Sequence, residues 1–213
     1  MDCLRKIKCN ELKDTLKKFK FDTKYYNNNV GKKFIEIYHF HEWNYGYDSI
    51  YYCINSDGSI RETFESTRRQ FYSDMKEMIN FLCDYINYNH ITDLIAAPLF
   101  SNPWISCELY SEIKDIYSEI VLFLKKNQIR KNAKSGVNFE VSENIEKLEM
   151  LVEGAFRGVS NAYLLSQEHN VVIEPSHHFN FIFYPSDFER ENKIITELLK
   201  KYPNLRYYED IIK

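Results

Sequence analysis

The chain is poor in glycine and proline and has no long apolar run. Of its 213 residues, 6 are glycine and 5 are proline, and the glycines are scattered. Phosphate-binding loops need clustered glycines, so P-loop NTPases, nucleotide-dependent kinases and Rossmann dehydrogenases are disfavoured. No apolar stretch approaches the roughly 18 residues that predict a membrane span, and no signal peptide is recognisable. We therefore expect a cytoplasmic protein without a membrane partner.

Cysteine and positive charge are also limited. The 5 cysteines are an odd number without C-x-x-C spacing, which argues against a disulfide framework and favours reduced thiols. The formal net charge is −3, whereas nucleic-acid-binding proteins present a basic face. No G-x-S-x-G elbow is present, and no cysteine lies in a nucleophile context. We expect no cofactor and no nucleic-acid partner.

Aromatic residues are abundant instead, with 17 tyrosines and 15 phenylalanines. Tyr, Asn, Ile and Lys are the residues that AT-rich codons favour, so this usage indicates the genome of a low-GC bacterium or a phage. Nucleotide bias alone therefore explains part of the tyrosine content, and a tyrosine is not functional merely because it is present.

The first half of the chain predicts three strands and then helices. Apolar alternation marks strands at 34–41, 49–55 and 60–64, and Asp57-Gly58 between the last two predicts a tight hairpin turn. We expect an antiparallel meander. Apolar residues at helical spacing predict a helix capped by Asn10, another from Phe71 to Ile86, and a third over 106–126. The stretch 94–100 is expected to be a strand or a buried connection.

The second half predicts a long helix over 142–168, followed by strand, strand, helix, strand. The helix carries Gly154 and Gly158 on one face, where a neighbouring element is expected to approach closely. Strands are expected at 171–174, 179–184 and 205–208, and Ser186 to Glu189 resembles a capping box that begins the last helix. The predicted fold is α+β, an antiparallel or mixed sheet with helices mainly on one face. It forms a single domain over 1–213, with the meander and helices in 1–135 and the remaining elements in 136–213.

The first predicted hairpin combines aromatic and acidic residues. Not all of these rings can be buried, and Tyr and Trp are enriched at protein interfaces. Acidic groups beside them would steer a basic protein partner toward this surface. The predicted binding residues are Glu42, Trp43, Tyr45, Tyr47, Asp48 and Tyr51. Codon bias together with ordinary core tyrosines is the competing explanation.

Histidines form the only other candidate site. On a strand, His39 and His41 project to the same side, as strand-borne metal ligands do. Glu174 and His177 would complete a metal site, and His39, His41, His177 and His178 would instead serve as acid–base groups. The competing interpretation places His39 and His41 on a solvent-facing strand surface, opposite Phe34 and Tyr38.

The preferred hypothesis is a non-catalytic protein-binding protein, for example a bacterial or phage inhibitor of the immunity-protein type, with a protein partner that is basic. The alternative is a small metal-dependent or histidine-based hydrolase of phosphodiesters or nucleotides. A structural homo-oligomer is a third hypothesis. An enzyme is thus the less favoured outcome.

Overall fold

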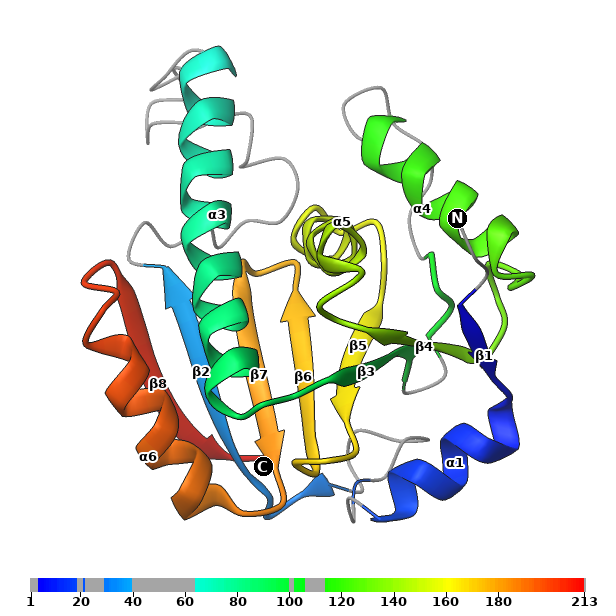
Figure 1. The fold of residues 1–213 in the computed structure, drawn as a ribbon. Helices are drawn as coiled ribbons and strands as arrows, with labels where there is room; N and C mark the ends of the chain where they lie inside the picture. The colour runs from blue at the N-terminus through cyan, green and yellow to red at the C-terminus, as the bar shows by residue number, and fades with distance from the viewer. Residues whose placement is uncertain are drawn as a thin grey trace.

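The computed structural model describes residues 4–18, 21, 29–39, 64–99, 102–105 and 114–212, and for 18 and 64–67 the backbone alone. Within them lie five helices and eight strands (Figure 1). In chain order they are β1 (Arg5–Ile7), α1 (Cys9–Lys18), β2 (Lys33–His39), α3 (Phe64–Tyr88), β3 (Asp93–Pro98), α4 (Lys114–Lys126), β4 (Gly136–Glu140), α5 (Ile145–Phe156), β5 (Ala162–Ser166), β6 (Val171–Ser176), β7 (Asn180–Pro185), α6 (Phe188–Leu199) and β8 (Leu205–Ile211).

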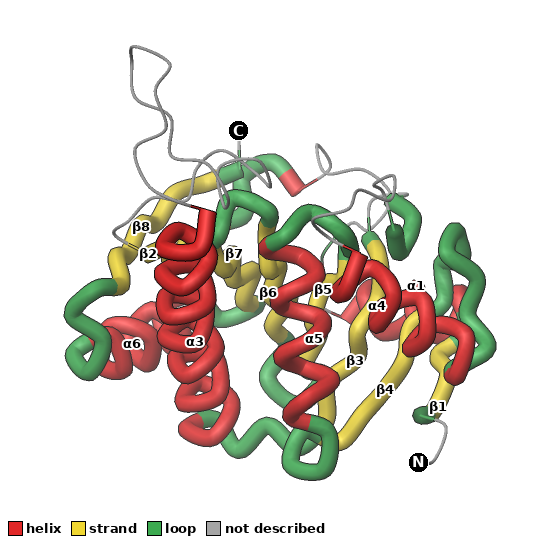
Figure 2. Tube along the Cα trace, turned by 90° about the horizontal axis from the view of Figure 1, so that it is seen from above, coloured by secondary structure: helices red, strands yellow, loops and turns green. Residues whose placement is uncertain are grey.

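One antiparallel sheet contains all eight strands in the order β1-β4-β3-β5-β6-β7-β2-β8. The predicted α+β single domain is confirmed. Helices α3, α4, α5 and α6 supply apolar side chains to the core on one face of the sheet, here called the front face (Figure 2). Helix α1 packs on the other face, the back face, where Leu12 and Leu16 contact residues of β3, β5 and β6. No helix in the described ranges is long and apolar enough to cross a membrane.

The front-face core is rich in aromatic rings. Phe179 lies 5.1 Å from Phe71 and 4.7 Å from Phe156 between ring centroids, so it joins α3 to α5 beneath the helices. Phe183 lies 5.0 Å from Tyr85 in an edge-on arrangement. Such ring pairs add about 0.5–1.5 kcal/mol to the burial of the same area. Many of the abundant aromatic residues therefore serve the core.

The expected meander pairing is wrong. β2 pairs with β7 on one side and with β8 on the other, so neither edge is free for a strand that follows it in sequence. The order of strands in the chain favoured a local hairpin, whereas the sheet places the C-terminal strands on both sides of β2. The predicted strands at 49–55 and 60–63 lie outside the described residues, and Phe64 is the first residue of α3.

The predicted helix over 142–168 is too long. α5 ends at Phe156, because Gly158 adopts a φ of +67° that ordinary residues avoid. The amides of Gly158 and Val159 donate to the carbonyls of Ala155 and Gly154, at 2.9 and 2.8 Å. These two bonds form a Schellman motif, which commonly closes helices at a glycine. Tyr163 belongs to strand β5, not to a helical stripe.

Gly154, inside α5, is closely approached by a side chain and not by the neighbouring backbone that glycines at this spacing were expected to admit. A Cβ atom there would stand 2.2 Å from the Cδ1 atom of Ile120 on α4. At the last helix, the N-cap is Asp187 instead of the expected Ser186, and its side chain accepts a hydrogen bond from the Arg190 amide at 3.1 Å. The strands β1 and β4 were not predicted.

Candidate functional site

Strands β5 and β6 separate at one end of the sheet. Their pairing runs from Ser166–Val171 to Leu164–Ile173 and stops there. β5 stays paired with β3 as far as Ala162, and β6 stays paired with β7 as far as Ser176. The sheet is therefore intact on both sides of the opening, which lies at the upper end of β6 in Figure 1. The end of α5 and the turn after it border the same opening.

A pocket of about 470 Å³ occupies this opening. Its polar lining comes from the turn after α5, from β5, from β6 and from the turn between β6 and β7, and consists of Ser160, Asn161, Tyr163, Glu174, Ser176 and His177, with Asn102 at one side. Its volume lies within the range of about 300–1,000 Å³ that is typical of small-molecule sites. We call this cavity the β5–β6 pocket.

Glu174 is the acidic group of the pocket. Its carboxylate accepts a hydrogen bond from the Tyr184 hydroxyl at 2.8 Å and another from Tyr163. Burial raises the pKa of Glu174, and the nearby carboxylate of Glu36 adds to this. The tyrosine hydroxyls and the charge of His178 offset only part of the rise. The site therefore disfavours a negative charge at Glu174 relative to water.

His177 lies in the turn after β6 and lines the same pocket. Partial burial lowers its pKa, and the adjacent His178, whose ring centroid is 4.0 Å away, lowers it further. A histidine whose pKa lies below the usual value of about 6.5 is neutral at pH 7. His177 therefore offers the pocket one donor and one acceptor nitrogen without a charge.

Ser160 contributes a hydroxyl that lacks a partner. The residue is 5 % exposed, and its Oγ atom forms no hydrogen bond to the described residues. Leaving a buried hydroxyl without a partner costs about 1–3 kcal/mol, and such groups are uncommon in native structures. The Ser160 amide, in contrast, donates to the Gly154 carbonyl at 3.0 Å. The Oγ atom is buried against α5, where a Cβ atom on Gly154 would stand 3.3 Å from it, and it is not exposed to the pocket.

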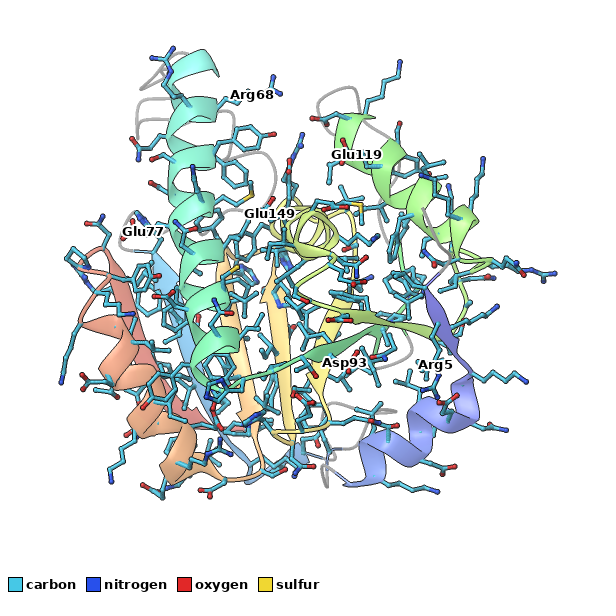
Figure 3. The ribbon with its side chains drawn as sticks, viewed as in Figure 1. Arg5, Arg68, Glu77, Asp93, Glu119 and Glu149 are labelled. Carbon is cyan, nitrogen blue, oxygen red and sulfur yellow. The ribbon has the colours of Figure 1, made fainter. Side chains whose placement is uncertain are left out.

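His39 does not join this pocket. It is 1 % exposed and faces the front side, so the expected solvent-facing position is wrong. Its Nδ1 atom lies 3.5 Å from an Asp74 oxygen and its Nε2 atom 3.4 Å from a Glu77 oxygen, both on α3. Figure 3 shows Glu77 on α3 beside the upper end of β2. Because the two carboxylates approach different ring nitrogens, one metal ion cannot bind all three side chains.

Only some residues of the predicted sites belong to the part of the chain that the structure describes. His41 and all of the predicted binding residues, Glu42, Trp43, Tyr45, Tyr47, Asp48 and Tyr51, lie outside the described residues, so these stay predictions. Of the predicted metal set, Glu174 and His177 line one pocket, and His39 lies in the cluster with Asp74 and Glu77. The described part of the chain contains no group of three or more His, Cys, Asp and Glu residues that could hold a metal ion.

Sequence reasoning missed Ser160, Asn161 and Tyr163, because it placed all three inside a long helix. A signal was present. Gly158, Ser160 and Asn161 are residues typical of turns, and their clustering would have ended the helix before β5. Recognising the stop would have placed Tyr163 on a strand.

Comparison with known proteins does not assign the chain to a family. No protein-family model matches the chain, and neither a curated protein nor a solved structure matches it. The site is therefore interpreted from its own geometry.

Proposed function

We propose that this protein acts by binding, and that the β5–β6 pocket holds a small polar ligand. The observation that carries the proposal is the pocket of about 470 Å³ at the point where β5 and β6 separate, with Glu174 in its lining. The neutral ring of His177 and the side-chain amide oxygen of Asn161 supply further hydrogen-bonding groups, while the Asn161 side-chain nitrogen donates to the Pro103 carbonyl at 2.8 Å. A few polar groups in a concave site are the usual means by which a pocket orients its ligand.

Ligand-observed NMR with a fragment library of cations, neutral polyols and anions tests this proposal. We expect fragments that bind the wild-type chain and lose binding in His177→Trp, which adds a bulky ring at the pocket wall. The control is Leu122→Trp, since Leu122 is 51 % exposed on α4 and does not line the pocket. The absence of any fragment with this pattern would contradict the proposal.

A basic protein partner is a second part of the proposal. Its support is the back face of β2 and β8, where exposed and half-buried aromatic rings stand beside carboxylates. Tyr208 is 46 % exposed, its ring lies 6.4 Å from that of Phe34, and its hydroxyl donates to Asp210 at 2.7 Å. An inhibitor of the immunity type would use such a surface. A host protein that is captured by the wild-type chain, is basic, and is lost with Tyr208→Ala supports this part, whereas equal capture by the variant contradicts it.

The hydrolase alternative keeps one observation in its favour, namely that Glu174 and His177 line the same pocket. A carboxyl group with a raised pKa and an imidazole with a lowered pKa can exchange a proton near neutral pH. Hydrolysis of a phosphodiester probe that disappears in both Glu174→Gln and His177→Ala would favour catalysis over binding alone. Activity that survives both substitutions would exclude these residues from such a role.

A further inference from the structure

Glu174 lacks a cationic partner. The ion pairs of the described residues involve other carboxylates, such as those of Glu153, Asp115 and Glu77. The partners of Glu174 are hydroxyl groups, from Tyr184 at 2.8 Å and from Tyr163. Buried carboxylates in proteins are normally paired with a cation or bound to a metal, because removal of the charge from water is costly. Glu174 thus has the environment of one half of an ion pair.

The rest of the pocket does not supply the missing positive charge. No lysine or arginine is among its described lining residues, and His177 has a lowered pKa. The amine of Lys134 lies nearby but donates to the main-chain oxygen of Asn102 at 2.6 Å. The groups that face Glu174 are Tyr163, Tyr184, His178 and Glu36, and Glu36 is itself acidic. The cationic groups near the pocket, the Lys134 amine and His178 when it is protonated, are not among its described lining residues.

We propose that the β5–β6 pocket binds a small organic cation, with an ammonium or guanidinium group of the ligand paired with Glu174. This inference rests on the proposed binding function and names the chemical class of its ligand. The ligand cation would donate charge-assisted hydrogen bonds to the carboxylate, which are about twice as strong as neutral ones. The side-chain amide oxygen of Asn161 is available for the polar remainder of the ligand, whereas its amide nitrogen donates to the Pro103 carbonyl at 2.8 Å.

The test uses isothermal titration calorimetry on the full chain with agmatine, a compact diamine-like cation, as the probe. Glucose serves as the neutral polyol and inorganic phosphate as the anion. We expect agmatine to bind and phosphate not to bind. Glu174→Gln keeps the shape and most hydrogen bonds of the side chain but removes its charge, and it should weaken agmatine binding at least about tenfold.

Glu36→Gln is the matched control. Glu36 lies on the same sheet face, two strands away across Ile182, and hydrogen-bonds to Asn180. It does not line the pocket, so its substitution should change agmatine affinity less than about threefold. A further readout is pH, since agmatine binding to wild type should strengthen as the pH rises through the raised pKa of Glu174, and Glu174→Gln should lose this dependence.

The outcomes separate the two proposals. Equal agmatine affinity in wild type and Glu174→Gln overturns the cation inference, and so does binding of glucose or phosphate without agmatine. In the latter case the pocket still binds a ligand, and the proposed binding function stands. If no probe binds and the fragment library also gives no ligand sensitive to His177→Trp, both proposals fail.

Discussion

Two clusters of buried charge lie near the same end of helix α5, and they are built in opposite ways. On one side, Arg157 is fully buried and binds carboxylates from two helices, Glu153 at 2.8 Å and Asp115 at 3.1 Å. On the other side, Glu174 has hydroxyl partners and no ion pair within the described residues, and the charge of His178 offsets only part of the effect of burial. The first cluster is internally compensated, whereas the second is left open to a cavity.

The pKa values of the carboxyl groups in the two clusters are shifted in opposite directions. Partial burial is the largest single influence on Asp115 and opposes its ionisation, but the hydrogen bond from Arg157, the main-chain hydrogen bonds and the charge of Arg157 together outweigh it, so the pKa of Asp115 lies below its usual value. The pKa of Tyr72, which donates to Glu153 at 3.0 Å, is raised to about 12 by burial and by that carboxylate. At Glu174 burial prevails, and the pKa is raised. In the Arg157 cluster the protein supplies both the cation and the carboxylates, and the cluster stabilises the fold. At Glu174 the described residues supply only the carboxylate, and we infer that a ligand supplies the cation.

The largest effect should come from removing the compensated cation. Arg157→Met keeps the length of the side chain but leaves Glu153 and Asp115 without their partner. We expect the free energy of unfolding to fall by about 2–4 kcal/mol, somewhat less than for a fully buried pair because both carboxylates are partly exposed. Urea denaturation measures this.

The control is Lys201→Met, because the Lys201–Asp84 pair is largely exposed. It should cost less than about 1 kcal/mol. Similar losses in the two variants would contradict the view that the Arg157 cluster holds α3, α4 and α5 together.

Helix α5 connects the two clusters, and its position depends on Gly154. In Gly154→Ala the new methyl group would meet Ile120 at 2.2 Å. Overpacking costs about 1–3 kcal/mol, and the better helix propensity of alanine returns up to about 1 kcal/mol, so we expect a net loss of about 1–2 kcal/mol. Ile120→Val removes the contacted atom. The double variant should be more stable than the sum of the two single losses predicts, and strict additivity would refute the contact.

Glu174→Gln should stabilise the protein at neutral pH, by less than the losses above. A carboxyl group whose pKa is raised on folding favours the folded state at low pH and opposes it once the pH rises above the folded-state pKa. Glutamine has no charge to bury. The gain should therefore be present at pH 7 and vanish as the pH falls below about 4, near the ordinary glutamate pKa. Thermal denaturation at several pH values follows it, and a variant less stable than wild type at pH 7 would contradict the uncompensated charge.

The smallest effect is expected at Ser160. Ser160→Ala removes a buried hydroxyl that has no partner, so stability should stay the same or rise by up to about 1 kcal/mol. Ser166→Ala is the comparison, because the Ser166 hydroxyl is buried and accepts a hydrogen bond from the His169 amide at 3.4 Å. That variant should lose stability by about 1 kcal/mol. A clear loss in Ser160→Ala would show that its hydroxyl has a structural partner.

Local sequence patterns predicted an individual helix or strand best where its apolar periodicity and the turn-forming residues at its ends indicated the same element. The strands around Ile173 and Phe183 and the helix around Met78 follow from alternation and from helical spacing. The helix at 142–168 was extended wrongly because Tyr163 happens to continue its stripe. Gly158 ends α5 through a backbone conformation, which an apolar pattern does not record.

The candidate site was predicted only in fragments. Glu174 and His177 were singled out as polar residues of a loop between apolar strands, and they do line the pocket. Their grouping with His39 was suggested by residue type alone. Asp74 and Glu77 lie one helical turn apart on α3 and contact the His39 ring, a pairing between strand and helix that no sequence spacing reveals.

The sequence by itself determined the class of the fold, because alternation and helical periodicity are properties of neighbouring residues. It also determined the acidic balance and the abundance of aromatic residues. The tertiary structure alone decided the strand order, since β7 and β8 reach β2 from the far end of the chain. It alone decided where β5 and β6 part, and thus which polar side chains share a pocket. The physical reason is that hydrogen-bond pairing and burial join residues that are distant in sequence, whereas periodicity reports only the face on which each residue lies.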